Sequence, residues 1–227
     1  MQYLDVSFDM KHPPLLDPGF IPFGVWMKAY LRDAKMPIAI AVERNNGQIS
    51  VIHAHIHGTP EMEKADYRFV ERYVKFLLWS IGGFRIYVCG CPAIAKKLQA
   101  AYCPEGERSF DCDFFHKLYE KDLQILDLPL DECPQPNESS LPMGGHLDGC
   151  RIGFDAGGSD RKVSAVINGE CVYSEEVVWH PKTQEDPNYH YEQILDALRT
   201  AASKMPRVDA IGVSSAGVFI GNAPMVA

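Results

Sequence analysis

Hydrophobic and polar positions in the first 130 residues alternate between strand-like and helix-like patterns. Residues 36–58, MPIAIAVERNNGQISVIHAHIHG, predict two strands around Asn45-Asn46-Gly47, because Asn-Gly tolerates the positive φ of a tight hairpin. Residues 61–83 predict a helix that ends at Gly82-Gly83. Its apolar face carries residues at helical spacing: Tyr67, Val70, Val74, Leu77, Leu78 and Ile81.

The rest of this region continues the α/β pattern. FRIYVCG predicts a strand, and PAIAKKLQAAY predicts a helix with Pro92 in its first turn. SFDCDFFHKLYEKD predicts a helix capped by Ser109, followed by a short strand in LQILDL. The order strand, strand, helix, strand, helix, helix, strand predicts an N-terminal α/β domain over residues 1–130. Its role is not indicated by the pattern.

A change in composition marks the next segment. Residues 131–149 are rich in proline, glycine and polar residues, which is typical of a linker or a long surface loop. The pattern then resumes at Cys150 and continues to residue 227, so we place a second domain there.

The second domain begins with three predicted strands, over residues 151–156, 162–167 and 171–179, with Asn168-Gly169 closing one hairpin. A helix follows, with Asp186 as its N-cap and Pro187 at its first position. Its buried face carries Ile194, Leu198, Ala201 and Met205. VDAIGVSSAG predicts a last strand that runs into a loop of small residues. The resulting order is β-β-β-α-β.

The turn between the first two of these strands carries the main candidate chemistry. Gly157 and Gly158 would let phosphate oxygens approach the backbone, and we expect them to permit the conformations that such a turn requires. Ser159 adds a hydroxyl donor, and Lys162 adds a counter-charge. Asp155 would repel phosphate directly, so its place makes sense beside Mg²⁺ or a water molecule. The alternative is an ordinary tight hairpin with a solvated Asp155.

GFDAGGSDRK resembles the first phosphate motif, D-x-G-G-[ST]-x-x-K, of the actin-like ATPase superfamily of sugar kinases, actin and heat-shock chaperones. The β-β-β-α-β order resembles the first lobe of that ribonuclease-H-like fold. VDAIGVSSAGVF resembles a segment of the ROK family of repressors and sugar kinases. The fold class expected is therefore α/β, with an N-terminal α/β unit followed by an incomplete ribonuclease-H-like lobe.

The resemblance also implies roles for individual residues. Asp155 would face Mg²⁺-ATP, and the turn at Gly157, Gly158 and Ser159 would hold the β- and γ-phosphates, with Lys162 at the last motif position. The substrate cleft would include Ser214, Ser215 and Gly217. Asp160 departs from many sugar kinases, which have Lys there.

The implied function is phosphoryl transfer from Mg²⁺-ATP to a sugar hydroxyl. The alternatives are a non-catalytic regulator that senses a sugar or nucleotide, and an ATPase that drives a change in a partner. The resemblance covers residues 150–227 and lacks the second lobe of such proteins. We therefore expect an N-terminal fragment that does not complete an ATP site unaided, with the catalytic base beyond residue 227.

Composition narrows the function classes. The formal net charge is −8, which disfavours a non-specific nucleic-acid or anionic-membrane binder, and no helix-turn-helix pattern is visible. No apolar run reaches membrane-span length and no signal-peptide pattern opens the chain, so we expect a cytoplasmic protein. A small-molecule sugar is the expected partner, and a homo-oligomer stays open.

Metal-ligating residue types occur at two further places. His53, His55 and His57 would share one face of a strand and could line a metal site, although a solvent-facing strand is the simpler interpretation. The seven cysteines include Cys89 and Cys91 in a C-x-C pair. No second pair at zinc-ribbon spacing accompanies them, so we expect packing and reduced thiols rather than metal or disulfides.

Overall fold

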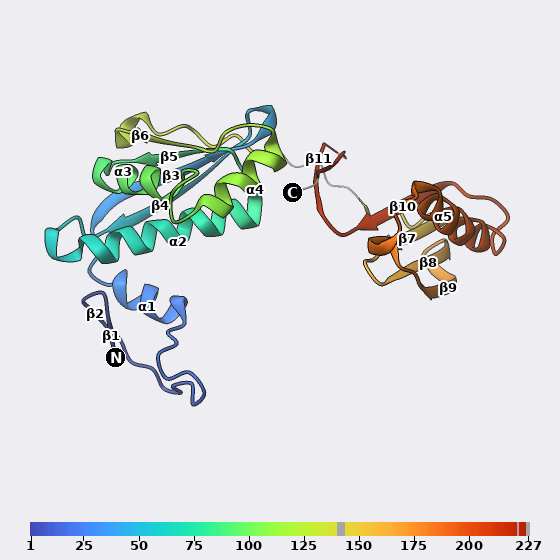
Figure 1. Cartoon of the computed structure of the whole chain (residues 1–227), viewed down its shortest axis with the longest axis horizontal. Helices are drawn as coiled ribbons and strands as arrows, with labels where there is room; N and C mark the ends of the chain where they lie inside the picture. Colours follow the sequence, from blue (N-terminus) through green and yellow to red (C-terminus); the bar gives the residue numbers. More distant parts are fainter. Residues whose placement is uncertain (140–143, 222, 226–227) are drawn as a thin grey trace. The chain divides into compact units, whose positions relative to one another are not determined.

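A computed structural model describes residues 1–139, 144–221 and 223–225 of the chain, which form two compact units (Figure 1). The N-terminal unit contains residues 1–139, and the C-terminal unit contains the other described residues. Both units combine helices and strands, so the expected α/β class is confirmed. Residues 140–143 of the expected linker lie outside the described residues. None of the described helices has the length and apolarity that crossing a bilayer requires.

The N-terminal unit is built on one four-stranded sheet in the order β4-β3-β5-β6. Its strands are β3 (Met36–Glu43), β4 (Ile49–Ile56), β5 (Arg85–Cys89) and β6 (Gln124–Leu128). β3 runs antiparallel to β4 and β5, and β5 runs parallel to β6. The predicted strand order along the chain is confirmed. The hairpin forms because Asn46 and Gly47 both adopt positive φ, at 61° and 67°.

Four helices belong to this unit: α1 (Phe23–Tyr30), α2 (Glu63–Ile81), α3 (Pro92–Ala101) and α4 (Ser109–Tyr119) (Figure 1). The cap predicted for α4 is wrong by one residue, because Arg108 occupies the N-cap position and makes no side-chain cap. The backbone explains the shift, since the N–H of Cys112 already donates to the carbonyl oxygen of Arg108 at 3.0 Å.

The core of the N-terminal unit lies on both faces of β3, where Ile38, Ala39, Ile40, Ala41 and Val42 are at most 1% exposed. Val70, Val74 and Leu78 of α2 are also buried, as their spacing predicts. The start of the expected linker is bonded to this unit, because Asn137 and Ile49 form an isolated bridge.

The C-terminal unit is built on a second four-stranded sheet in the order β10-β7-β8-β9. Its strands are β7 (Cys150–Ala156), β8 (Asp160–Ile167), β9 (Glu170–Val178) and β10 (Ala210–Ser215). β7, β8 and β9 form an antiparallel meander, and β10 runs parallel to β7. The helix α5 (Pro187–Ala202) connects β9 to β10, so the β-β-β-α-β order is confirmed.

α5 packs on one face of this sheet. The strands contribute Cys150, Ile152, Phe154, Val163 and Ala165 to the core, and the helical side contributes Ala197, Ala201 and Met205. The helix begins as predicted, because Asp186 accepts a hydrogen bond from the N–H of Asn188 at 2.9 Å. Side chains alternate along a strand, so the intervening residues of β7 and β8 face away from α5.

A bulge interrupts the pairing of β8 with β9. Ala165 lies opposite Tyr173, whereas Val166 lies opposite Cys171, so Val172 is the extra residue. The irregularity lies near the turn at Asn168-Gly169, where both residues have positive φ. The pairing from Asp160 to Ala165 stays regular.

Several short strand pairs and helical turns were not expected. β1 (Gln2–Tyr3) pairs with β2 (Val6–Ser7), and β11 (Val218–Ile220) pairs with β12 (Ala223–Met225). A short helical turn, η4 (Pro181–Thr183), lies between β9 and α5. Elements of two or three residues carry too few positions to show a hydrophobic period.

Candidate functional site

A row of polar side chains crosses the sheet face opposite α5. The strand register places Ser214 of β10 beside Asp155 of β7, Asp155 beside Lys162 of β8, and Lys162 beside Glu176 of β9. Each of the four strands therefore contributes one side chain to the same level of the sheet. Because β7 and β10 are parallel, Asp155 and Ser214 both stand near the carboxyl ends of their strands.

A second row, two residues further back along β7, consists of small residues. Gly212, Gly153, Ser164 and Ser174 occupy the corresponding positions of the four strands. Gly153 is tightly placed, since a Cβ there would lie 2.9 Å from Oγ of Ser164. The small side chains leave the sheet surface hollow at this level.

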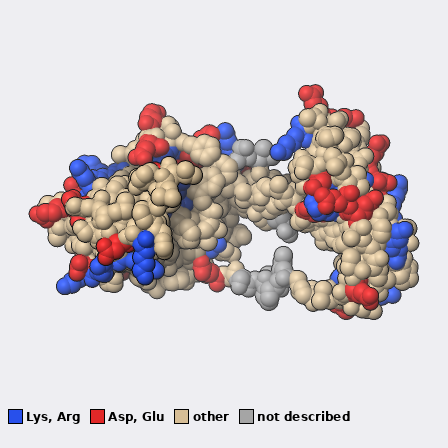
Figure 2. Space-filling view, turned by 90° about the horizontal axis from the view of Figure 1, so that it is seen from below, with Lys and Arg blue, Asp and Glu red and all other residues tan. Residues whose placement is uncertain are grey.

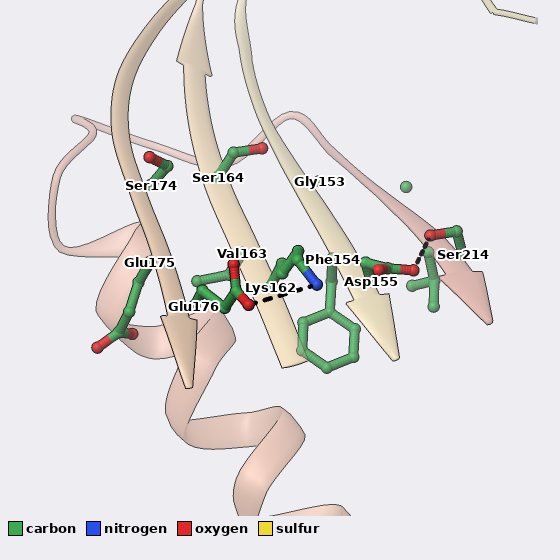
Figure 3. Close-up of a pocket in the computed structure, with 12 residues that line it drawn as sticks. Gly153, Phe154, Asp155, Lys162, Val163, Ser164, Ser174, Glu175, Glu176 and Ser214 are labelled. Carbon is green, nitrogen blue, oxygen red and sulfur yellow. Dashed lines mark hydrogen bonds and ion pairs between the residues drawn. The ribbon is translucent and has the colours of Figure 1, made fainter. Parts of the chain in front are cut away.

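The two rows line a shallow pocket of about 640 Å³ (Figure 3). This volume falls within the roughly 300–1,000 Å³ that is typical of small-molecule sites. Figure 3 shows the strands side by side, with Asp155 pointing toward Ser214 and Lys162 pointing toward Glu176. Glu175 borders the pocket, but it pairs with Val163, so its side chain lies on the face of the sheet that carries α5.

Asp155 and Ser214 form the central contact of the pocket. Oγ of Ser214 donates a hydrogen bond to Oδ1 of Asp155 at 2.6 Å. Their position matches the general rule that open α/β sheets bind ligands beyond the carboxyl ends of parallel strands, where the strand order changes direction. In this sheet the change of direction lies between β7 and β10. The chain adds β8 and β9 on one side of β7 and then crosses over to add β10 on the other side.

Lys162 is already paired with carboxylates. Its Nζ donates to Oδ1 of Asp160 at 2.8 Å and lies 3.8 Å from Oε1 of Glu176. The hydrogen bond to Asp160 raises the pKa of Lys162, and the same bond lowers the pKa of Asp160. The expectation that Lys162 supplies a counter-charge to a ligand therefore competes with two partners in its own chain.

The turn at Gly157, Gly158 and Ser159 joins β7 to β8 beside this pocket. Gly157 is required for space, because a Cβ there would collide with the backbone carbonyl oxygen of Asp160. A Cβ on Gly158 would meet the end of the Lys182 side chain. The conformational argument for these glycines is wrong, since neither of them adopts positive φ. Their small size is what the turn uses.

Trp179 fixes the turn from the end of β9. Its indole N–H donates to the carbonyl oxygen of Gly157 at 2.8 Å, and its backbone N–H donates to that of Ser159 at 3.1 Å. The side chain is 3% exposed. A buried tryptophan with both donors satisfied holds the turn in one conformation.

The expected site residues are only partly brought together. Asp155, Lys162 and Ser214 line the pocket, while Ser159 is exposed on the adjoining turn. Ser215 and Gly217 do not line it: Oγ of Ser215 donates to the carbonyl oxygen of Ala216 at 3.3 Å, and Gly217, at φ 122°, faces open space.

Sequence reasoning missed nine of the twelve lining residues; those that belong to the two rows are Gly153, Ser164, Ser174, Glu176 and Gly212. The signal was the period of two, because most of these residues stand two positions from a member of the polar row on the same strand. That signal becomes useful only when the register of the strands is known.

The pocket carries an excess of negative charge. Two carboxylates (Asp155 and Glu176) and one ammonium (Lys162) project from the pocket face of the sheet, and a third carboxylate, Asp160, is bonded to Lys162. Figure 2 shows acidic side chains gathered on one face of the C-terminal unit, with basic ones beside them. An anion entering alone would be repelled, so a phosphate ligand would need an accompanying cation.

Metal binding by protein side chains alone is not indicated. Among the described residues, no group of three or more His, Cys, Asp or Glu side chains is arranged to hold a metal ion. For the three histidines of the β4 region, the structure agrees with a solvent-facing strand. His53 and His55 are exposed, and Nε2 of His57 lies 2.9 Å from the carbonyl oxygen of Tyr30. Mg²⁺ differs, since it is commonly held by one or two carboxylates together with phosphate oxygens.

Comparison with known proteins gives little further guidance. No protein-family model and no curated protein matches this chain. One solved structure that aligns with it is an exopolyphosphatase from Cytophaga hutchinsonii, at 10% identity and a TM-score of 0.23, over 79% of this chain and 64% of that one. The chain thus spans less than two thirds of that protein, and an alignment at this TM-score carries no argument about function.

Proposed function

We propose that the C-terminal unit binds the phosphates of Mg²⁺-ATP and that the protein is a ROK-like sugar kinase, which transfers a phosphoryl group to a sugar hydroxyl. The observation that supports this most is the Asp155–Ser214 pair, which stands at the carboxyl edge of two parallel strands beside a glycine turn. The resemblance of GFDAGGSDRK to a phosphate motif supports the same assignment.

In this proposal Asp155 holds the metal ion. Ser214 donates to Oδ1 of Asp155, which orients the carboxylate and leaves its acceptor capacity largely available. The donor set fits Mg²⁺, a hard cation that prefers oxygen ligands. When bound, Mg²⁺ supplies positive charge to phosphate oxygens, which offsets the carboxylate excess of the pocket. The glycine turn would offer backbone N–H groups to the phosphates.

The second row of the pocket suits a hydroxyl-rich ligand. Ser164 and Ser174 can donate and accept hydrogen bonds, and Glu176 of the adjoining polar row accepts them. Carboxylates that accept from sugar hydroxyls also discriminate strongly, because a ligand lacking the hydroxyl leaves them unpaired. The role of this row is to position a sugar, and catalysis would rest on alignment and charge stabilisation.

Calorimetric titration of the full chain with Mg²⁺-ATP tests the proposal. We expect Asp155→Ala to weaken binding at least about tenfold, since it removes a charge-assisted contact. Glu170→Ala is the matched control, because Glu170 is exposed at the opposite end of β9, and its binding should equal that of the wild type. A folded wild-type protein that binds no Mg²⁺-ATP would contradict the proposal.

One observation favours a second candidate, a non-catalytic sugar sensor of the same fold. Lys162 is engaged by Asp160 and Glu176, which makes the pocket a poor phosphate site and a good polyol site. The two candidates separate when sugars are titrated with and without Mg²⁺-ATP. A sensor binds sugar independently of Mg²⁺-ATP and releases no ADP, whereas a kinase releases ADP in proportion to phosphorylated sugar.

A further inference from the structure

Lys182 lies over the glycine turn. It belongs to the short helical turn η4, which follows Trp179 after β9. A Cβ built on Gly158 would lie 3.3 Å from Cε and 3.5 Å from Nζ of Lys182. The end of the Lys182 side chain is therefore close to the backbone of Gly158, on the side of the turn where a larger residue would place its Cβ.

The backbone that carries Lys182 is anchored on both sides. The N–H and Oγ1 of Thr183 donate to the carbonyl oxygen of His180 at 3.2 and 3.1 Å. Nε2 of His190, in the first turns of α5, lies 3.1 Å from the carbonyl oxygen of Pro181. Trp179 ties the same segment to the turn. Lys182 thus projects from a fixed base rather than from a loose loop.

The charge of Lys182 is unmatched within the structure. No ion pair joins it to a carboxylate in residues 1–139, 144–221 or 223–225, whereas Lys162 contacts two carboxylates. An exposed ammonium beside a turn with little side-chain bulk is available to a ligand. Lysine binds phosphate as a compact point charge on a flexible stem, so its side chain can follow a phosphate group that enters the turn.

We propose that Lys182 is a phosphate-binding residue, which closes over a phosphate chain held by the Gly157-Gly158-Ser159 turn and supplies the cation that Lys162 cannot. This inference rests on the proposed function of the same site. The chemistry recognised is a chain of linked phosphates, from a nucleoside triphosphate or from inorganic polyphosphate. In this proposal Asp155 binds the metal ion, and Lys182 binds the phosphate oxygens.

The first experiment titrates the full chain calorimetrically with Mg²⁺-ATP and, separately, with Mg²⁺-tripolyphosphate. Lys182→Gln should weaken both by about tenfold, the size of one charge-assisted contact. Lys182→Arg should retain most of the affinity. Lys204→Gln is the matched control, because Lys204 is an exposed lysine of the same unit that lies over the ring of Tyr173; its affinity should not change. Equal loss for both probes identifies the phosphate chain, and loss for Mg²⁺-ATP alone identifies a nucleotide-dependent contact.

The second experiment needs no variant. The wild-type chain is acylated at low reagent concentration with and without Mg²⁺-ATP, and labelling at each lysine is measured by peptide mass spectrometry. Lys182 should be protected severalfold by Mg²⁺-ATP, while Lys204 should be labelled equally in both samples.

The outcomes separate the two proposals. Wild-type binding that Asp155→Ala abolishes and Lys182→Gln leaves unchanged, with Lys182 unprotected, would overturn the role of Lys182 and leave the proposed function standing. A folded wild-type chain that binds neither probe would overturn both. Weakened binding in Lys182→Gln together with selective protection would support both.

Discussion

Carboxylates in the two units have very different surroundings. In the N-terminal unit Asp66, Glu71 and Asp111 are 2–3% exposed, and each is engaged by several groups of its own chain. In the C-terminal unit Asp155 is half-buried and accepts from one described residue, Ser214. A carboxylate whose acceptor capacity is filled by its own chain is structural, whereas one with capacity left can serve a ligand.

Asp66 illustrates the first kind. Its Oδ1 accepts from the hydroxyl of Tyr30 at 2.6 Å and from the N–H of His57 at 3.0 Å, and its Oδ2 accepts from the N–H of Gly58 at 2.7 Å. Burial raises the pKa of Tyr30 far above its ordinary value, and the bond to Asp66 raises it further. The carboxylate thus joins α1 and the end of β4 to α2.

Glu71 and Asp111 join helices in the same way. Glu71 of α2 is surrounded by Arg68, Arg72 and Arg108. Asp111 of α4 accepts from Nζ of Lys75 at 3.0 Å and from the indole N–H of Trp79 at 2.6 Å, both on α2. Two acids that the sequence places on helices therefore hold α2, α4 and the residue preceding α4 together.

The largest expected effect is on stability, and it tests this contrast directly. Asp66→Ala should lower the free energy of unfolding by about 3–5 kcal/mol, because the hydroxyl of Tyr30 and the backbone N–H groups of His57 and Gly58 lose their acceptor. Asp155→Ala should change it by less than about 0.5 kcal/mol. Urea denaturation followed by circular dichroism measures both. Similar losses in the two variants would break the distinction between structural and available carboxylates.

A smaller effect is expected within the C-terminal unit, where the two turn glycines differ. Gly157→Ala should destabilise the chain by about 1–3 kcal/mol, because its methyl group meets the backbone carbonyl of Asp160. Gly158→Ala should be close to neutral, since its methyl group meets only the flexible end of Lys182, at 3.3 Å. Thermal unfolding of the two variants provides the comparison. Equal melting temperatures would show that the turn relaxes without cost.

The smallest expected effect is a difference in the alkylation rates of buried and exposed cysteines, which involves no change in the stability of the fold. Burial raises the pKa of Cys89 to about 12 and that of Cys112 to about 11, while Cys171 in β9 is exposed. A raised pKa means less thiolate, so at pH 8 only about one Cys89 in 10⁴ would be reactive. Alkylation followed by mass spectrometry should modify Cys171 first. The rate at Cys89 should rise about tenfold per pH unit up to about pH 11. Equal rates at Cys89 and Cys171 at pH 8 would contradict the difference in burial.

Most of the regular structure could be predicted from the sequence, because long elements repeat their hydrophobic period several times. α2 and the hairpin around Asn46-Gly47 are examples, each with strong local signals. The N-cap of α4 was misplaced because Ser109 has the preferred residue type, whereas the backbone bonds start one residue earlier. The two-residue strands β1 and β2 depend on pairing that no local pattern reveals.

The candidate site was predictable only along single segments. Asp155 and the glycine turn are adjacent in the sequence, so their proximity could be predicted without knowledge of the fold. The neighbours of Lys162 could not be predicted without the fold, because Glu176 is brought beside Lys162 by the register of β8 with β9. Lys182 lies 24 residues after Gly158 in the sequence, and its contact depends on the bonds that Trp179 makes to the turn.

The bulge at Ala165/Val166 has a consequence for how this domain can tolerate change. A slip of β8 by one residue would send Lys162 and Ser164 toward α5 and Val163 toward the pocket, which the buried core opposes. The irregular pairing lies at the Asn168-Gly169 end, away from the polar row. Insertions or deletions at that hairpin can therefore be absorbed before they reach the pocket. The hairpin is the place where this unit can vary in length, or accept a grafted peptide, while its four-strand polar row keeps its alignment.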